Sequence, residues 1–485
     1  MNLDTLVLPT DTRPVDTLIK AGEIDAPDDY DLYPGYFQPR QVSRRFVGDK
    51  FTTVDGHFLL RYWRGDFWLY DGTTFHIVDD EADVREPMWD RLEEVTVKVG
   101  DDEEKPWAPT SARLNGLMEP IQIETRLPNR MDAPMLTNKR SRPTPAPGVI
   151  AMGNGLFDLT TRELQASSPA MFTTWALPFD YDPAATCPTW TNFMAETFAH
   201  DPEAIDVLQE WFGYCVSERT DQQKGLLLMG PGGSGKGVTT RILEYLVGHD
   251  NVAATNMEKL SKGFGLANLV GKQLAVIPDS RDSGTINETA TSTLLSVIGE
   301  DSVPVEKKGI DIMTMKLPTR IVLVSNEMPS FKDSSGALVK RWIVVETKVG
   351  VRGTDREDPH LGAKLAAELP GIFNWALDGL DRLNRNGRFT NLESTTGTVE
   401  MLHDAAAPEA QFMDEHFKPA PPEEFVWLAE VYEKYRQWME ARGNRSVSQN
   451  RFKNRVKAAG LPGLTFTKRD QGGARKEAIA GISWS

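Results

Sequence analysis

The sequence contains little cysteine, with only Cys187 and Cys215 in 485 residues. Two cysteines exclude a disulfide scaffold and a zinc site built from cysteine, and the seven histidines lack the spacing of metal ligands. No stretch approaches the roughly 20 apolar residues that cross a bilayer. The amino-terminal residues also lack the basic region and apolar core of a secretory signal. We therefore expect a cytoplasmic protein without membrane contact.

The composition is that of a globular protein. Hydrophobic residues make up 40% and charged residues 26% of the chain, proportions that exclude wholesale disorder, collagen and coiled coil. A length of 485 residues is too great for one hydrophobic core. We therefore expect two to four domains.

Charge is distributed unevenly along the chain. The net charge of −16 argues by itself against nucleic acid binding. Residues 1–105, however, contain 24 acidic and 12 basic side chains, whereas residues 441–476 contain ten basic side chains and one acidic side chain. The basic segment is a candidate surface for phosphate contacts, and an ordinary solvated helix face is the equally weighted alternative.

The region 1–150 mixes strand and helix patterns and is predicted to be an α+β domain. Residues 57–72 alternate aromatic and polar side chains, which predicts an antiparallel hairpin with Gly65-Asp66 at its turn. We expect a helix near 81–95. Residues 128–148 are rich in Pro, Ser and Thr and predict a loop or linker.

Residues 151–220 predict a helical segment, and residues 221–390 predict an α/β domain. Helical apolar spacing between 190 and 217 indicates two helices. Beyond 225, short apolar runs alternate with helical segments, which predicts a sheet covered on both faces. These runs are 226–229, 274–277, 320–325 and 342–346. Residues 369–387 predict a helix that ends at a glycine.

A glycine-rich loop follows the first of these runs and precedes a helical segment. Glycines let a backbone curl around a phosphate without Cβ clashes, and the N–H groups of the following helix terminus converge on it. Lys236 would then reach the β- and γ-phosphates of a nucleotide such as ATP. The candidate nucleotide-binding residues are Gly230, Pro231, Gly232, Gly233, Ser234, Gly235, Lys236, Gly237 and Val238.

This loop departs from the common pattern at Gly237, which stands where a hydroxyl normally ligates Mg²⁺. The departure leaves Mg²⁺ to phosphates, waters and an acidic residue elsewhere. A purely structural turn is the alternative, and the preceding strand and following helix favour the nucleotide site over it.

Polar residues follow the later strands. Asp279 comes after 274–277 and is the candidate Mg²⁺ ligand, with Asp282 assisting the attacking water. Asn326 follows 320–325, where an amide can orient water without adding charge. Arg341 precedes 342–346 and is a candidate for stabilising phosphate charge from a neighbouring subunit. Taken singly, these residues are more often turn or surface ion-pair residues.

The order of these motifs resembles the superfamily 3 helicase core of the phage and plasmid primase–helicase family, which includes the poxvirus helicase–primase. The segments that carry the resemblance are the phosphate loop, IPDSRD, IGEDSVPVEKKG, LVSNEMP, VKRWIVVE and LPGIFNWALDGL. It extends over about 150–385 and is weaker on either side. The resemblance implies an AAA+-like P-loop ATPase core that assembles as a homo-oligomer, a hexameric ring, around DNA, with ATP bound between subunits.

The same resemblance assigns roles to individual residues. Lys236 matches the phosphate-loop lysine of the family, Asp279 the strand-end acid, Asn326 the polar sensor and Arg341 the arginine that acts in trans. The channel hairpin of the family, which grips DNA, falls at 306–309. Its candidate residues are Lys307, Lys308 and, more weakly, Lys316, and an exposed hairpin tip with solubilising lysines is an equally good interpretation.

Two features depart from the family pattern. Asp279 stands where a longer glutamate is more common. The roughly 150 residues before the resemblance are short for a catalytic primase domain and contain no paired-carboxylate motif with a supporting histidine. We therefore expect a helicase without primase activity, which would depend on a separate primase or polymerase.

Residues 410–485 resemble a small winged-helix domain. The spacing of Trp427, Val431, Tyr435 and Trp438 predicts one helical face that forms core. A basic second helix and a short β segment follow, as a winged helix-turn-helix needs. The candidate phosphate contacts are Arg451, Lys453 and Arg455, together with Lys468.

Three functions fit these patterns. The leading hypothesis is an ATP-dependent helicase acting on single-stranded and forked DNA in replication of a phage or mobile element. An origin-binding initiator or loader with little unwinding activity is the alternative. A small-molecule P-loop kinase explains the phosphate loop and leaves the sensor, the arginine and the basic tail without a role.

Overall fold

The structure is a computed structural model in which the chain divides into two compact units. The first unit contains Met1–Ala185 with Leu246–Gly248 and Leu369–Gly371, and the second contains the remainder. The residues described are 11–99, 103–137, 142–217, 219–278, 285–286, 288–306, 313–331, 337–350, 354, 358–399, 402, 408–442, 446–458, 461, 463–471 and 474–485.

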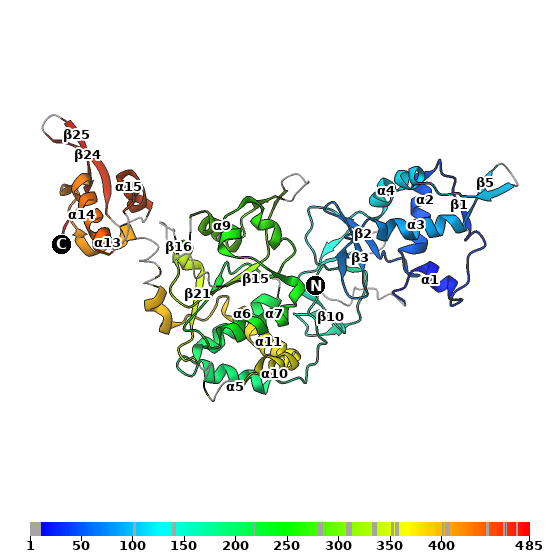
Figure 1. The fold of residues 1–485 in the computed structure, drawn as a ribbon, viewed down its shortest axis with the longest axis horizontal. Coiled ribbons are helices and arrows are strands. Elements are labelled where there is room, and N and C mark those ends of the chain that lie inside the picture. The colour runs from blue at the N-terminus through cyan, green and yellow to red at the C-terminus, as the bar shows by residue number, and fades with distance from the viewer. Residues whose placement is uncertain are drawn as a thin grey trace. The chain divides into compact units, whose positions relative to one another are not determined.

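The first unit combines helices with small sheets (Figure 1). Its helices are α1 (Val15–Lys20), α2 (Pro39–Lys50), α3 (Ala82–Glu94) and α4 (Ser111–Thr125). Its strands are β1 (Leu32–Tyr33), β2 (Leu60–Trp63), β3 (Asp66–Tyr70), β4 (Phe75–Ile77), β5 (Thr96–Val99), β6 (Glu103–Pro106), β7 (Met135–Leu136), β8 (Thr144–Pro145), β9 (Val149–Met152), β10 (Gly155–Asp158), β11 (Leu164–Gln165) and β12 (Met171–Phe172).

The predicted hairpin forms, because β2 pairs antiparallel with β3. Its turn lies at Arg64 and Gly65 rather than at Gly65-Asp66, since Asp66 pairs with Trp63 in the strands. Both turn residues have positive φ, 54° and 95°, as a two-residue hairpin turn requires. The loop predicted over 128–148 is interrupted by β7 and β8. Met135 and Leu136 are buried, which explains why this Pro-rich segment still forms a small sheet with β12.

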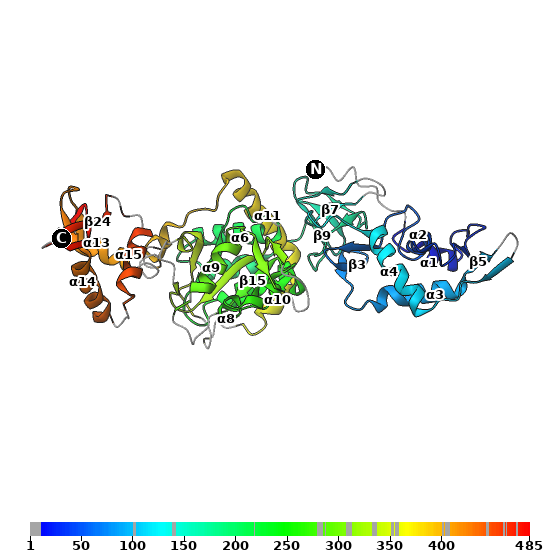
Figure 2. The same cartoon turned by 90° about the horizontal axis from the view of Figure 1, so that it is seen from above.

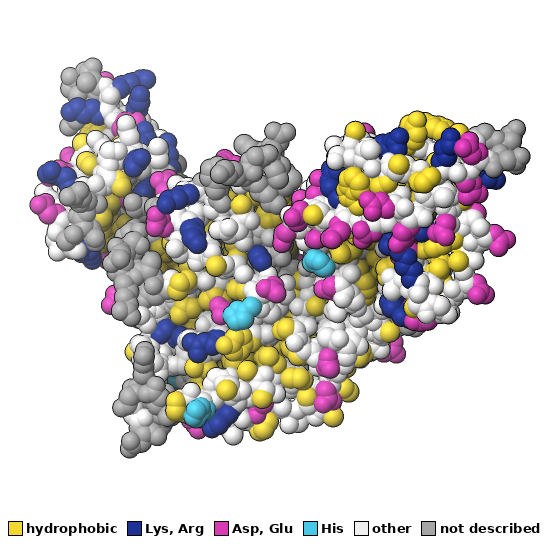
Figure 3. All heavy atoms as spheres, turned by 45° about the vertical axis from the view of Figure 1, so that its right-hand side comes forward, with side chains coloured by type: hydrophobic (Ala, Val, Ile, Leu, Met, Phe, Trp, Pro, Cys, Tyr) yellow, Lys and Arg dark blue, Asp and Glu magenta, His cyan; other side chains and the backbone are white. Residues whose placement is uncertain are grey.

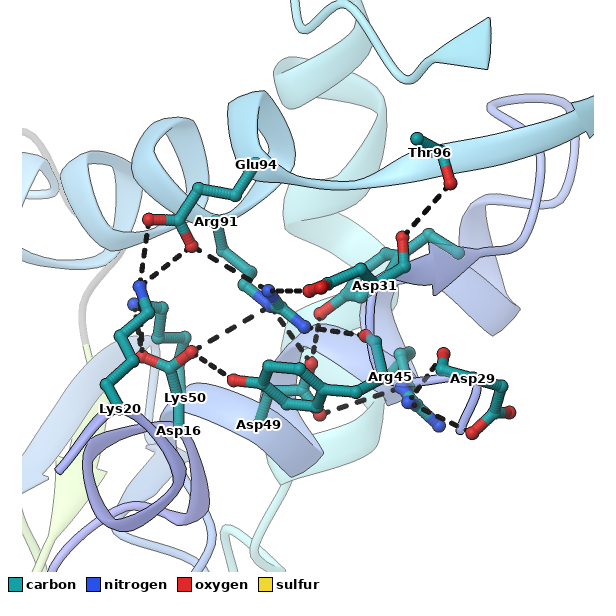
Figure 4. Close-up of polar contacts among 12 residues, drawn as sticks. Asp16, Lys20, Asp29, Asp31, Arg45, Asp49, Lys50, Arg91, Glu94 and Thr96 are labelled. Carbon is teal, nitrogen blue, oxygen red and sulfur yellow. Dashed lines mark hydrogen bonds and ion pairs between the residues drawn. The ribbon is translucent and has the colours of Figure 1, made fainter. Parts of the chain in front are cut away.

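A buried ionic network joins the helices of the first unit (Figure 4). The Arg91 side chain of α3 is only 1% exposed and pairs with Asp49 at 3.2 Å and Asp31 at 3.0 Å. Its guanidinium also lies 3.9 Å from the centre of the Tyr30 ring. Asp16 accepts a hydrogen bond from Lys50 at 2.7 Å. The network holds α1, α2 and α3 together through paired charges.

The second unit contains the predicted α/β region. Its helices before residue 390 are α5 (Pro188–Thr197), α6 (Glu203–Val216), α7 (Lys236–Val247), α8 (Met257–Leu260), α9 (Glu288–Ile298), α10 (Leu361–Ala367) and α11 (Leu369–Asn386). Its strands are β13 (Gly225–Met229), β14 (Val252–Ala253), β15 (Leu274–Ile277), β16 (Thr285–Ile286), β17 (Val303–Val305), β18 (Met313–Met315), β19 (Arg320–Ser325), β20 (Ser330–Phe331) and β21 (Trp342–Glu346).

Five of these strands form one parallel sheet in the order β14-β15-β19-β13-β21. All five residues of β13 are buried, so both faces of the sheet are covered, as its continuous apolar pattern predicts. The chain leaves β13 toward the β14 edge and later crosses back to β21 on the other side. The carboxyl end of β13 is therefore a topological switch point, where open α/β sheets bind ligands.

Helices α6 and α11 pack closely, and Figures 1 and 2 both draw them side by side. A Cβ at Gly213 of α6 would lie 2.4 Å from the carbonyl oxygen of Ala376, and one at Gly379 of α11 would lie 2.2 Å from that of Gln209. Only glycine permits this approach of the two backbones. As predicted, α11 ends at Gly387, which has a left-handed φ of 68°.

The C-terminal residues form a separate hydrophobic core. Its elements are α13 (Pro408–His416), β22 (Phe417–Pro419), β23 (Phe425–Trp427), α14 (Leu428–Ala441), α15 (Gln449–Ala458), β24 (Thr465–Gln471), β25 (Ala474–Ala480) and β26 (Ile482–Trp484). Val431 and Tyr435 of α14 are buried in this core, as predicted. Trp427 was expected on the same helical face. It is instead the last residue of strand β23, where it pairs with Ala478 of β25.

Candidate active site

The glycine-rich loop lies between the carboxyl end of β13 and the first turn of α7, at the switch point of the sheet. Gly230, Gly233 and Gly235 have φ of 139°, 75° and 95°, values that a side chain would strain. A Cβ at Gly230 would lie 2.0 Å from the carbonyl oxygen of Thr347, which follows β21. The loop therefore needs glycine for its backbone path and for its packing.

Two hydroxyls hold the loop to the neighbouring strand. The Ser234 and Thr347 hydroxyl oxygens are 2.5 Å apart, and Thr347 donates to the carbonyl of Met229 at 3.1 Å. The Ser234 hydroxyl also donates to the carbonyl of Pro231 at 2.7 Å. These contacts tie the loop to the carboxyl end of β21.

Lys236 is 5% exposed and lies along the inside of the loop. Its ammonium donates to the carbonyls of Gly230 and Pro231, the latter at 2.8 Å, and to the amide oxygen of Asn326 at 3.2 Å. The structure thus brings together two residues that the sequence placed on separate strands. Their contact follows from the parallel pairing of β13 and β19, whose carboxyl ends meet at one edge of the sheet.

Open space adjoins the loop at two other glycines. A Cβ added at Gly232 or at Gly237 would meet no atom within 4 Å. The loop therefore has room for a side chain at these two positions. The fold has room for a side chain at Gly237, so steric crowding does not explain why this position lacks a hydroxyl.

The candidate acids, Asp279 and Asp282, lie outside the described residues, directly after β15. Among the residues that the structure describes, no group of three or more His, Cys, Asp or Glu could hold a metal ion. Glu346 and Glu327 are described acids at this edge of the sheet, at the carboxyl ends of β21 and β19. The Glu346 carboxylate accepts a hydrogen bond from Thr398, and its backbone carbonyl lies 3.1 Å from His200 Nε2.

Arg341 lies at the opposite end of the sheet from Lys236. Gly225 pairs with Trp342 at the amino ends of β13 and β21, and Met229 pairs with Glu346 at their carboxyl ends. Five strand residues separate the two ends by about 15 Å. Arg341 therefore lies at the end of the sheet that is remote from the phosphate loop.

A basic cluster surrounds Arg341 and consists of Lys224, Lys340 and Arg341. Lys224 donates to the backbone carbonyl of Lys340 at 2.7 Å. Burial, followed by the charge of Arg341, lowers the pKa of Lys224. The Nη1 atom of Arg341 is buried without a hydrogen-bond partner in the described part of the chain. Unneutralised cations of this kind suit an incoming anion.

The predicted DNA-contacting residues fall into distinct surroundings. Strands β17 and β18 pair antiparallel. Lys307 and Lys308 lie outside the described residues. Lys316 is exposed just after β18. In the C-terminal domain Lys453 pairs with Glu477, and Arg455 pairs with Glu409 at 3.0 Å.

Arg451 of α15 is exposed and forms no ion pair among the described residues. Of the three helix cations predicted to contact phosphates, it alone is not engaged by an acid within the domain.

Three residues of this site were not predicted: Lys224, Glu346 and Thr347. Glu346 and Thr347 end or follow a recognised strand, so parallel pairing with β13 could have placed them beside the loop. The role of Lys224 could not be predicted from the sequence, because a lysine before a strand is common on any protein surface.

Two family models match separate parts of this chain. Residues 44–199 match a family model described as "D5 N terminal like". This match supports the resemblance of the chain to the phage and plasmid primase–helicase family. Residues 228–341, which include the phosphate loop, match a family of unknown function, DUF5906. No helix among the described residues combines the length and the apolar character needed to cross a membrane.

A curated relative and two solved structures are also similar. An uncharacterized mitochondrial protein, ymf21, of Marchantia polymorpha is 25% identical over 134 residues, 25% of this chain and 74% of the relative. An apo structure of the NrS-1 C terminal region has a TM-score of 0.46 and 10% identity, covering 87% of this chain and 95% of that chain. A second, in its A form, has a TM-score of 0.42 and 13% identity, covering 64% and 81%.

Proposed function

We propose that this protein is an ATP-dependent DNA helicase that acts in replication of a phage or another mobile element, in the cytoplasm of the host cell. The observation that carries the proposal is the glycine loop at the carboxyl end of β13, with Lys236 bonded to Asn326 of the adjacent strand. The match of residues 44–199 to the "D5 N terminal like" family model supports a role in replication.

The loop has the features of an ATP site in an AAA+-like P-loop domain. The space beside Gly232 and Gly237 would admit phosphates, and the amino terminus of α7 would direct N–H groups toward them. Lys236 would exchange the carbonyls of Gly230 and Pro231 for phosphate oxygens. Asn326, released from the lysine, would orient the attacking water.

A bound Mg²⁺ would neutralise phosphate charge. We assign its protein ligand to Asp279, with Asp282 assisting the water. Because Gly237 supplies no hydroxyl, the remaining ligands would be phosphate oxygens and waters. This assignment predicts that Asp279→Ala impairs hydrolysis more than nucleotide binding.

Arg341 suits a role in trans. It lies at the amino end of β21, and its buried Nη1 has no partner among the described residues. In a ring, the basic cluster would face the nucleotide held by the next subunit, with Lys224 as a second cation beside Arg341. We propose a homo-oligomer, a hexamer, in which ATP binds at each subunit interface.

DNA would pass through the ring and contact the β17–β18 hairpin, where Lys307, Lys308 and Lys316 would grip its phosphates. The order helix, strand, two helices and hairpin in the C-terminal domain is that of a winged helix, which would add further DNA contacts. A separate primase or polymerase would complete replication.

Strand displacement tests this proposal. A forked duplex with a labelled strand is incubated with ATP and either the wild type or Lys236→Ala. We expect the wild type to release the strand and the variant to release none. Tight binding to one duplex sequence without displacement would instead identify an origin-binding loader, and it would contradict the helicase assignment.

A further inference from the structure

The C-terminal sheet β23-β25-β24 has two different faces. Val426 and Ile479 are aligned across the strands and are 6% and 0% exposed, so their face packs on the domain core. The residues that precede and follow these two in their strands point to the opposite face of the sheet, because successive side chains of a strand alternate between faces. This outer face is formed by Phe425, Trp427, Thr465, Thr467, Arg469, Lys476, Ala478 and Ala480.

The outer face carries two opposed cations. Arg469 is the direct cross-strand partner of Lys476, and both are exposed. Like charges in this position destabilise an antiparallel pair. Neither side chain forms an ion pair within the described residues. On the inner side, by contrast, Lys468 faces Glu477. A bound polyanion would relieve the repulsion between Arg469 and Lys476.

Aromatic rings lie beside these cations. Phe425 is 38% exposed, and its ring centre lies 5.1 Å from that of Trp427. The Arg469 guanidinium lies 5.2 Å from the Phe425 ring centre. The aligned residues of β25 between them, Ala478 and Ala480, are small enough to leave this approach open. Rings and guanidinium together offer base stacking and phosphate contact.

Two of the four cations of helix α15 form ion pairs within the domain. Lys453 and Arg455 are held by Glu477 and Glu409, so they already balance acids of the fold. Figure 1 shows the β24–β25 hairpin extending beyond α13, α14 and α15. In Figure 3, Lys and Arg side chains gather near its outer end.

We infer that the outer face of β23-β25-β24 binds single-stranded DNA, with Phe425 stacking on a base and Arg469 and Lys476 contacting phosphates. This inference rests on the proposed function, which makes DNA the substrate, and it names the residues of a second contact surface. Single-stranded DNA is favoured over duplex because a duplex keeps its base faces stacked and unavailable to Phe425. An acidic protein partner would leave the exposed ring without a stacking role.

The experiment measures binding of a fluorescein-labelled oligothymidylate to the full chain without nucleotide, by fluorescence anisotropy. We expect Phe425→Ala and Arg469→Ala each to weaken binding about tenfold, in line with the energy of one stacked base. Removal of one phosphate contact should lower the salt dependence of log K by about 0.7. The matched control is Arg436→Ala, since Arg436 is an exposed cation of α14 that Glu433 balances at 2.8 Å.

Three results would overturn the inference. The first is that Phe425→Ala and Arg469→Ala both bind the oligothymidylate with the affinity of the wild type. Another is weakened binding in Arg451→Ala alone, which would place the contact on α15. A third is loss of oligomer in the outer-face variants, with unaltered DNA binding, which would make the face a contact between copies. ATP hydrolysis without DNA is measured in parallel, so failure of the ATPase assignment remains separate from failure of this surface.

Discussion

Single glycines define the shape of the candidate ATP site. Gly230 has a φ of 139°, and a Cβ there would overlap the carbonyl of Thr347 at 2.0 Å. Gly232, two residues on, has open space and no positive φ. The two positions therefore separate a glycine that the fold requires from one that it tolerates.

We predict that Gly230→Ala destabilises the protein without any nucleotide present, because the residue must leave a backbone region that is nearly exclusive to glycine. Such strain costs about 1–3 kcal/mol, which lowers the melting temperature by roughly 5 °C. Gly232→Ala, the matched control, should melt within 1–2 °C of the wild type, about the size of a neutral surface change. Equal melting of both variants in differential scanning calorimetry would contradict this account of the loop.

The residues of the site were predictable to different degrees. Lys236 and Asn326 follow strands that are continuous apolar runs, so their meeting at one sheet edge needs only parallel pairing. Pairing of Lys453 with Glu477 and of Arg455 with Glu409 joins residues 24 and 46 positions apart. No local pattern encodes such contacts, and the predicted phosphate roles of these two cations remain predictions.

Elements with strong periodicity were predicted well. The apolar runs at 226–229 and 342–346 became β13 and β21, and Gly387 ended α11 as expected. Strand β14 contains two residues, too few for a pattern, and it was missed. The first compact unit extends to Ala185 rather than 150, because short strands such as β9 and β12 pair over distances that sequence does not reveal.

The packing of helix α3 against its neighbours depends on the buried side chain of Arg91. In Arg91→Leu the buried carboxylate of Asp49 loses its closest ion-pair partner, which is 3.2 Å away in the wild type. Breaking a buried pair costs about 3–5 kcal/mol, which should lower the melting transition of the first unit by roughly 10 °C.

The control for Arg91→Leu lies on the same helix. Arg85 pairs with Glu81 at the surface, at 3.0 Å, and exposed pairs contribute about 0–1 kcal/mol. Arg85→Leu should therefore change the transition little. If the two variants melt alike in calorimetry, the network does not hold α1, α2 and α3 together as described.

At the scale of the whole molecule, strand polarity separates Lys236 from Arg341. One lies at the carboxyl end of β13 and the other at the amino end of β21. No sequence motif predicts this separation by itself. It follows from the parallel pairing of β13 with β21, which puts the start of one strand beside the start of the other. The proposed ring would bring the two residues together between neighbouring subunits, in a head-to-tail interface.

Mixing two inactive variants tests this arrangement. Lys236→Ala keeps Arg341, and Arg341→Ala keeps Lys236, so some interfaces of a mixed ring contain both intact residues. We expect equimolar mixtures to recover up to roughly a quarter of wild-type ATP hydrolysis, the share of intact interfaces in random head-to-tail rings. Absence of recovery in mixtures that co-assemble, as shown by size-exclusion chromatography, would rule out action in trans.

The central claim is that this protein couples ATP hydrolysis to movement on DNA. Its most direct test is steady-state ATP hydrolysis with and without single-stranded DNA, for the wild type and Lys236→Ala. We predict that single-stranded DNA stimulates hydrolysis by the wild type several-fold, as expected of a motor. Lys236→Ala should hydrolyse no ATP, with or without DNA. Hydrolysis that is indifferent to DNA, or that survives in Lys236→Ala, would contradict the claim.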